Sequence, residues 1–285
     1  MEKITSIPPY DRARVSLDDV RQWFVLIESY VHAAGEERLS LASFDERALV
    51  SFILESNQLE RTIPPDITLD HALEACSASE ELSESAENCR WYADGRRNKQ
   101  GTPALSIQLQ RHYQSLLYLL SQEELTPEVV INTHEIMLAG ALDHRGERLE
   151  VGKFRDGEVF IPNGHVFPPP EAVPRTVEAI CRSFEDGLKE KRANFLSLST
   201  KLFFEMIQIH PFFDGNGRLC RMLLAHAIIR LGILPFPLTL SSFHSTSRSD
   251  YLRAIKRWQD MAKSSDLHYL VLKSVYRSFR TYPKG

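Results

Sequence analysis

The stretch that decides the fold spans residues 210–221 and reads HPFFDGNGRLCR. Within it, Gly215 and Gly217 flank Asn216, and a helical pattern begins immediately afterwards. Such a glycine-rich turn can point successive backbone N–H groups at one spot, which forms an anion nest at the positive end of a helix. The stretch therefore predicts a phosphate-binding turn between two helices.

The charged side chains of the same stretch point to nucleotide chemistry. Arg218 and Arg221 lie three positions apart on one face of the first helical turn, where they oppose the helix dipole by about a few tenths of a kcal/mol. A bound polyanion explains this local conflict. Asp214 alone would repel phosphate, but with Mg²⁺ between them it becomes a metal ligand. His210 is the one group here whose pKa suits proton uptake near neutrality.

Each feature has an ordinary explanation when it is taken singly. A histidine before proline usually ends a helix, Gly-Asn-Gly is usually a turn, and paired arginines are usually solvated. The combination is far more specific, and it resembles the signature of the Fic (Fido-domain) family, His-Pro-Phe-x-Asp/Glu-Gly-Asn-Gly-Arg-x-x-Arg, at every fixed position. The resemblance extends from about Leu125 to Ser265, and it implies a mostly α-helical fold with one β-hairpin flap.

The resemblance implies a protein adenylyltransferase, which moves AMP from ATP to a Ser, Thr or Tyr hydroxyl of a target protein. His210 would deprotonate that hydroxyl, and Asp214 would hold Mg²⁺. Arg218 would contact the outer phosphates and Arg221 the γ-phosphate, while Tyr251 would border the adenine pocket. The full nucleotide-binding set that it implies is Gly215, Asn216, Gly217, Arg218, Arg221 and Tyr251.

A β-hairpin is expected upstream, because Asp156-Gly157 separates two runs rich in β-formers, residues 151–155 and 158–161. The hairpin resembles the family's flap, and an exposed strand can pair with an extended target backbone and so position a hydroxyl. The residues assigned to target positioning are Lys153, Phe154, Arg155, Val159 and Ile161.

A helix is expected over about residues 46–57, with Ser56-Asn57 as its natural end. It carries Ser51-Phe52-Ile53-Leu54-Glu55-Ser56, which resembles the family's inhibitory motif Ser/Thr-x-x-x-Glu-Gly/Asn and departs from it at Ser56. The resemblance implies that Glu55 pairs with Arg221 and takes the place of the γ-phosphate, since a carboxylate competes well for a guanidinium.

Apolar spacing predicts further helices. They are expected at residues 17–31, from residue 127 onward, at 174–188, 195–209 and 218–231, and from residue 250 to the C-terminus. We expect an N-terminal helical region at residues 1–106 with the inhibitory helix, and a catalytic region at residues 107–285 with a Fido core at about 125–265.

Composition narrows the classes of function. The 285 residues carry 34 Lys+Arg and 38 Asp+Glu, a net charge of −4, which gives no basic footprint for nucleic acid. No apolar run is long enough to span a membrane, and residues 1–5 lack the apolar region of a signal peptide. The sequence therefore predicts a cytoplasmic protein without a membrane contact. Its cysteines show no CxxC pair and are expected as reduced thiols, at Cys76, Cys89, Cys181 and Cys220.

Three alternatives stay open. Glu55 could position a water that removes AMP from a modified hydroxyl, which makes the protein a de-AMPylating phosphodiesterase. The chain could instead bind a nucleotide as a regulatory protein without turnover. Transfer of UMP or phosphocholine is a further possibility within the family, and so is a homodimer.

Overall fold

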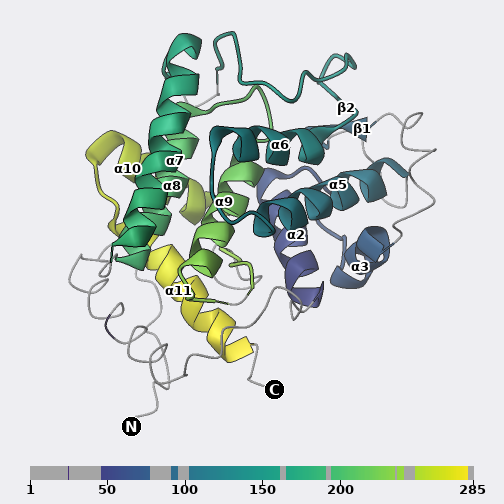
Figure 1. Ribbon diagram of the computed structural model, residues 1–285. Helices are drawn as coiled ribbons and strands as arrows, with labels where there is room; N and C mark the ends of the chain where they lie inside the picture. Colours follow the sequence, from purple (N-terminus) through teal and green to yellow (C-terminus); the bar gives the residue numbers. More distant parts are fainter. Residues whose placement is uncertain are drawn as a thin grey trace.

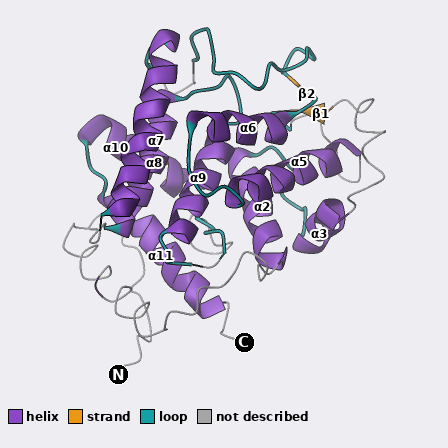
Figure 2. Ribbon diagram, in the orientation of Figure 1, coloured by secondary structure: helices purple, strands orange, loops and turns teal. Residues whose placement is uncertain are grey.

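The computed structural model describes residues 25, 46–77, 91–95, 103–160, 165–190, 194–234, 236–240 and 248–281. These residues fold mainly into α-helices, with one short pair of parallel strands (Figures 1 and 2). The elements are α2 (Glu46–Glu60), α3 (Leu69–Ser77), β1 (Trp91–Tyr92), α5 (Pro103–Leu120), α6 (Pro127–Leu138), β2 (Ala141–Leu142), the 3₁₀ turn η2 (Pro170–Ala172), α7 (Val173–Lys189), α8 (Phe195–Ile209), α9 (Asn216–Arg230), α10 (Arg248–Met261) and α11 (Ser265–Thr281).

Helix α9 is the centre of the fold. It packs against α8, α5 and α2, and Figure 1 shows it in the middle of the bundle. Its sequence is apolar on all sides after the first turn, as in Leu219, Met222 and Leu224, and a helix of that kind is buried around its circumference. The burial places the first turn of α9, where the two arginines lie, beside the C-terminal ends of α8 and α2.

The expected helices of the described region are confirmed, and their ends follow local chemistry. Thr126 caps α6 by accepting a hydrogen bond from the N–H of Val129 at 3.2 Å, and Pro127 takes the first helical position. Asn194 caps α8 in the same way. The C-terminal pattern forms two helices rather than one, because Ala262 adopts a left-handed conformation between α10 and α11. The helix expected at residues 17–31 lies outside the described residues apart from Val25.

Helix α2 does not end at Ser56-Asn57, as the sequence predicted, but continues to Glu60. Asn57 is fully buried, and its side chain bonds within the core instead of ending the helix. The helix ends where Arg61 takes a left-handed conformation with φ of 58°. This extra turn brings Glu60 against the start of α9.

The predicted hairpin does not form between residues 151–155 and 158–160. Residues 151–155 form no strand, and Gly157 lacks the positive φ that a two-residue Asp-Gly turn requires. The antiparallel bridge joins Phe160 to Val166 instead. The physical reason is that Arg155 turns inward, where its backbone N–H donates to the carbonyl of Pro211 at 2.9 Å. Residues 158–160 therefore have no strand partner in residues 151–155, and the hairpin consists of the bridged residues around Phe160 and Val166.

In the part of the chain that the structure describes, no helix has both the length and the apolar composition needed to cross a membrane.

Candidate active site

His210 lies at a sharp turn directly after α8. Its backbone is left-handed, with φ of 49° and ψ of 65°, a conformation that costs a residue other than glycine about 1–2 kcal/mol. Pro211 prevents the helix from continuing. The imidazole stacks on the ring of Phe167, with ring centroids 4.1 Å apart and an angle of 24° between the rings. The turn and the stacked ring together fix the direction of the imidazole.

The imidazole of His210 is neutral at physiological pH. Burial above all, together with the nearby charge of Arg155, lowers its pKa to about 4, although a hydrogen bond with the backbone of Ile207 and the charge of Glu60 act in the opposite direction. A neutral imidazole can accept a proton. The geometry is therefore that of a general base held ready at the edge of the anion site.

The turn from His210 to α9 is held by packing from α6. Gly215 has φ of 75°, and a Cβ there would lie 2.8 Å from the Cε of Met137. His134 stacks flat on Phe212, with centroids 3.7 Å apart, and its Nε2 donates to the carbonyl of Asp214 at 3.0 Å. Only glycine fits this turn, which leaves the N–H groups of the first turn of α9 pointing at one place.

The side chain of Asn216 holds the turn in place. Its Oδ1 accepts from the N–H of Phe212 at 3.0 Å, and its Nδ2 donates to the carbonyl of Phe212 at 2.7 Å. The carboxylate of Asp214 accepts from the N–H of Gly215 at 2.5 Å and is 37% exposed, so it faces solvent beside the nest. Any contact of Asn216 with phosphate is left to its backbone N–H.

Arg218 and Arg221 are buried, at 1% and 2% exposure. Arg218 donates to the carbonyl of Ala93 at 3.0 Å and lies 3.7 Å from Oδ1 of Asp214. Its Nε and Nη1 are buried and have no hydrogen-bond partner among the described residues. Burial lowers the pKa of Arg218, yet a guanidinium keeps its charge. An anionic ligand could accept hydrogen bonds from these two unpaired N–H groups of the buried guanidinium.

Among the contacts of the described residues, the carboxylate that meets Arg221 is that of Glu60, and the expected pair of Arg221 with Glu55 is not among them. Arg221 pairs with Glu60, whose Oε1 lies 2.7 Å from Nη1. It also donates from Nε to the hydroxyl of Ser56 at 2.9 Å and from Nη2 to the carbonyl of Ser56 at 2.8 Å. Ser56 and Glu60 are four positions apart and share a face of α2, whereas Glu55 lies about 100° around the helix from Ser56. Glu55 is buried, at 3% exposure, on another face.

The carboxylate of Glu60 stands at the start of α9. A Cβ built on Gly217 would lie 2.1 Å from Oε1 of Glu60, so the carboxylate touches the backbone of the first turn. Burial raises the pKa of Glu60, but Arg221 above all, with Arg218 and Arg248, lowers it more, and the net pKa lies below its ordinary value. Glu60 is therefore ionised, and its negative charge lies at the start of α9.

Glu60 is a residue that the sequence reasoning missed. A signal for it exists, since Ser56-Asn57-Gln58-Leu59-Glu60 repeats the Ser-x-x-x-Glu spacing of Ser51 to Glu55 five positions later. His134 and Arg248 were also missed. The Nε of Arg248 donates to the carbonyl of Leu59 at 2.5 Å and so holds the end of α2.

Tyr251 is buried in the core, at 3% exposure. Its hydroxyl accepts a hydrogen bond from Nη1 of Arg221 at 3.3 Å, and its ring meets Phe203 edge to face. Burial raises its pKa to about 12. In this arrangement Tyr251 supports Arg221. Trp258 stacks flat on Phe204, with ring centroids 4.0 Å apart.

The residues assigned to the flap separate into different environments. Lys153 is exposed and pairs with Glu150 at 2.7 Å. Phe154 and Val159 are half-buried, and Arg155 is buried at 3% exposure. Ile161 lies outside the described residues. The bridged pair, Phe160 and Val166, is exposed, at 81% and 85%.

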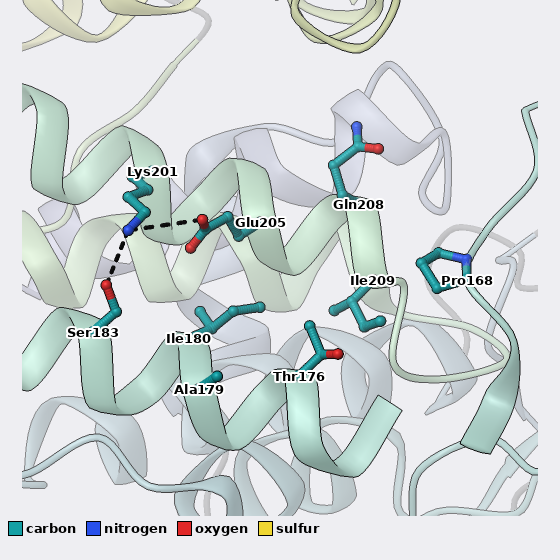
Figure 3. Close-up of a pocket in the computed structure, with 9 residues that line it drawn as sticks. All are labelled: Pro168, Thr176, Ala179, Ile180, Ser183, Lys201, Glu205, Gln208 and Ile209. Carbon is teal, nitrogen blue, oxygen red and sulfur yellow. Dashed lines mark hydrogen bonds and ion pairs between the residues drawn. The ribbon is translucent and has the colours of Figure 1, made fainter. Parts of the chain in front are cut away.

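A groove of about 410 Å³ opens between α7 and α8 (Figure 3). Apolar side chains meet at its floor, as Ile180 and Ile209 do in Figure 3. Lys201 closes one end, where it donates to the hydroxyl of Ser183 at 2.9 Å and lies 3.8 Å from Glu205. The groove extends along α7 and α8 as far as Ile209, and its lining does not include His210 or the anion site.

Comparisons with known proteins agree with this geometry. Residues 124–228 match the model of the Fic/DOC family. A protein named protein adenylyltransferase Fic, from Drosophila willistoni, is 28% identical over 214 residues, which cover 72% of this chain and 40% of that protein. The protein of the same name from Nematostella vectensis is 29% identical over 135 residues, which cover 46% of this chain and 29% of that protein. The chain thus spans less than half the length of these relatives.

Solved structures share the fold. Fic-1 (residues 134–508) from C. elegans has a TM-score of 0.66 at 17% identity, with 93% of this chain and 72% of that chain covered. A Fic family protein from Desulfovibrio desulfuricans G20 has a TM-score of 0.64 at 19% identity, with coverages of 97% and 77%. The residues that match the Fic/DOC family contain the whole stretch from His210 to Arg221, and the solved structures share the fold around it.

Proposed function

We propose that the protein is a protein adenylyltransferase, which transfers AMP from ATP to a Ser, Thr or Tyr hydroxyl of a target protein. The observation that carries the proposal is the buried guanidinium of Arg218, whose Nε and Nη1 find no partner among the described residues, close to the neutral base His210. A cationic cradle beside a neutral base suits the attack of a hydroxyl on a phosphoryl group. The names of the sequence relatives support the same activity.

The reaction needs little from the protein beyond a base and a cradle. His210 takes the proton of the target hydroxyl, whose oxygen then forms a bond to the α-phosphorus of ATP. The bond from that phosphorus to the oxygen bridging to the β-phosphate breaks, and pyrophosphate leaves. Arg218 and the first N–H groups of α9 stabilise the charge on the leaving group. The negative charge of bound ATP raises the pKa of His210 from about 4 toward neutrality, which makes it a stronger base.

Asp214 fits a role in holding Mg²⁺. Its carboxylate is 37% exposed beside the nest, and the N–H of Gly215 occupies its Oδ1. Mg²⁺ commonly takes one or two carboxylates and completes its shell with phosphate oxygens and water, so a single carboxylate suffices. The ion would neutralise charge on the phosphates as pyrophosphate departs.

A restraint by α2 is the second part of the proposal. The family resemblance points to Glu55, whereas the contacts favour Glu60, because its carboxylate bonds to Arg221 and touches the backbone at Gly217. A nucleotide whose phosphate needs Arg221 and the start of α9 must first displace this carboxylate. The free protein is then expected to transfer AMP slowly until α2 moves.

The test is covalent labelling with α-labelled ATP and Mg²⁺ in the wild type, Glu60→Gln and Glu55→Gln. Glutamine keeps the size of each side chain and removes its charge, so the two variants are matched. We expect strong labelling of protein in Glu60→Gln, weak labelling in the wild type and in Glu55→Gln, and none when His210→Ala is added. Labelling with γ-labelled ATP should be absent, since pyrophosphate leaves.

Other results would change the proposal in defined ways. Strong labelling in Glu55→Gln alone would return the restraint to Glu55. Nucleotide binding without label in any variant would favour a regulatory protein without turnover. Release of AMP from a modified protein that depends on either glutamate would favour the phosphodiesterase. Label from UTP or CDP-choline in place of ATP would change the transferred group.

A further inference from the structure

The side chain of Arg155 is almost fully enclosed, and it makes four hydrogen bonds to backbone carbonyls. Its Nε donates to the carbonyl of His210 at 2.8 Å, and its Nη2 to that of Ile209 at 3.3 Å. Its Nη1 donates to the carbonyl of Gly157 at 2.9 Å, and Nη2 also to that of Pro168 at 2.5 Å. The guanidinium forms no ion pair with a carboxylate among the described residues. One side chain thus ties together three separate segments.

Two of these bonds hold the base. The carbonyls of Ile209 and His210 stand at the C-terminal end of α8, where carbonyls lack helical partners. A histidine in the left-handed conformation persists only where its surroundings impose it. The backbone N–H of Arg155 adds a bond to the carbonyl of Pro211 on the other side of His210. Arg155 therefore forms hydrogen bonds to the strained turn on both sides of His210.

The other two bonds hold the hairpin. Gly157 and Pro168 bracket the segment that contains the bridged pair Phe160 and Val166, the most exposed apolar side chains near the site. Phe167, next to Pro168, stacks on the imidazole of His210. Arg155 thus connects the hairpin to His210, and the ring of Phe167 packs directly on the imidazole beside this connection.

We infer that Arg155 is the positioning residue that fixes the imidazole of His210 relative to the hairpin at the bridged pair Phe160 and Val166. The inference rests on the proposed transfer reaction, in which a hydroxyl presented along the hairpin must meet the base. Arg155 acts through His210 and does not touch the reacting atoms. It therefore governs the rate of transfer and leaves nucleotide binding unchanged, because the cradle of Arg218, Arg221 and α9 makes no contact with it.

Lysine cannot replace this arginine. The guanidinium presents five N–H donors in a planar fork, which reaches acceptors in several directions, whereas an ammonium is a compact point charge on a flexible stem. Arg155→Lys keeps the positive charge near His210 and loses the geometry. The variant therefore separates positioning from electrostatics.

The experiment compares Arg155→Lys with Arg182→Lys, both in the Glu60→Gln protein. Arg182 is an exposed arginine on α7 that pairs with Glu178, so it is a matched control for the same chemical change. We expect Arg155→Lys to lower the rate of AMP transfer at least about tenfold, since a misplacement of about 1 Å can cost about a hundredfold. The dissociation constant for ATP should stay within about twofold, and Arg182→Lys should change neither quantity.

A second readout does not depend on activity. Phe167 shifts the ring-proton NMR signals of His210 through its ring current, and Arg155→Lys should move these signals toward their positions in an unstacked imidazole. A transfer rate within about twofold of the parent together with unmoved His210 signals would overturn the inference. If the parent transfers no AMP at all, the proposed function fails, and the NMR result alone decides the role of Arg155.

A further variant keeps the inference testable if Arg155→Lys does not fold. Phe167→Leu removes the stacked ring and leaves the guanidinium and its carbonyl partners in place. It breaks the contact between hairpin and base from the other side, so it should also lower the transfer rate and leave ATP binding unchanged. An unchanged rate in a folded Phe167→Leu protein would contradict the coupling.

Discussion

The carboxylate of Glu60 lies 2.7 Å from Nη1 of Arg221 and touches the backbone at Gly217, where α9 begins. An anion that binds to the first turn of α9 would occupy the same space. Under the proposed function, the Glu60 carboxylate and a nucleotide phosphate therefore compete for one place. Because of this competition, the affinity for nucleotide depends on how stable the contact between the last turn of α2 and α9 is.

The first prediction concerns that competition. Glu60→Gln should bind ATP with Mg²⁺ about ten to a hundred times more tightly than the wild type, because a hydrogen bond to a charged group contributes about 1.5–3 kcal/mol. Isothermal titration calorimetry measures the change, with Glu55→Gln as the control. An unchanged dissociation constant in Glu60→Gln would show that the carboxylate does not compete with phosphate.

The same substitution should weaken the nucleotide-free protein. Arg221 is 2% exposed and would keep its charge without the counter-charge of Glu60, so the free energy of unfolding should fall by about 1–3 kcal/mol. Saturating ATP should restore most of this loss, because a ligand that binds only the folded state stabilises it. Urea unfolding with and without ATP tests both statements.

The second prediction separates backbone strain from packing at the turn. Gly215 and Gly232 both have positive φ, but a Cβ at Gly215 would meet Met137 at 2.8 Å and Leu138 at 2.9 Å, whereas a Cβ at Gly232 meets nothing within 4 Å. Gly232→Ala should therefore lower the free energy of unfolding by about 1 kcal/mol, through the strain of a positive φ alone. Gly215→Ala should cost about 1–3 kcal/mol more through overpacking and should also weaken ATP binding. Equal losses at the two positions would contradict the packing argument.

Much of this site was predictable from sequence because it is local. The residues from His210 to Arg221 are consecutive, so their spacing alone places a base, a nest and two arginines around one turn. The helix at residues 195–209 was predicted with both of its ends, and Thr126 and Pro127 predicted the start of the helix at residues 127–138.

The errors concern contacts made across the fold. Glu55 and Glu60 both lie near the end of α2 in Ser-x-x-x-Glu spacings, and only the docking of that helix on α9 decides which carboxylate meets Arg221. The Asp156-Gly157 pair is a sound local turn signal, but burial of Arg155 against the end of α8 overrides it. The spacing of apolar residues along a sequence indicates helices and strands, but it does not indicate which distant side chains meet.

The third prediction is a loss of stability in mild acid. Burial lowers the pKa of five histidines: His134 and His226 to about 3, His210 and His268 to about 4, and His112 well below its ordinary value. In the unfolded chain these groups take up protons below about pH 6.5. The folded state resists protonation until about pH 4, so stability is full above pH 6.5 and falls as the pH drops through this window. Each histidine contributes a slope of about 1.4 kcal/mol per pH unit.

Urea unfolding at several pH values between 4.5 and 7 measures this slope. His226 is the suitable control, since neither ring nitrogen has a hydrogen-bond partner among the described residues. His226→Leu should remove one proton from the uptake on unfolding and lower the slope by about 1.4 kcal/mol per pH unit. Stability that does not change between pH 7 and pH 5 would show that these histidines are not held neutral in the fold.

The fourth prediction concerns Asn57, which anchors the last turn of α2. Its Nδ2 donates to the carbonyl of Ile53 at 2.8 Å and lies 2.9 Å from Nδ1 of His112. Its Oδ1 accepts from the hydroxyl of Thr62 at 2.9 Å and from Nε2 of Gln108 at 3.1 Å. The residue is 0% exposed, so Asn57→Leu leaves several buried groups without this partner and should lower the free energy of unfolding by about 2–4 kcal/mol.

The same variant should bind ATP more tightly than the wild type despite its lower stability. Asn57 lies within the turn that carries Ser56 and Glu60, so losing the anchor frees the carboxylate to leave Arg221. Gln58→Leu is the matched control, because Gln58 is half-buried and makes one bond, to the carbonyl of Ile67 at 3.4 Å. It should change the free energy of unfolding by less than about 1 kcal/mol and leave ATP affinity unchanged. Asn57→Leu that loses stability with no gain in ATP affinity would mean that Glu60 stays in the phosphate site without this anchor, and the restraint would then depend on Arg221 alone.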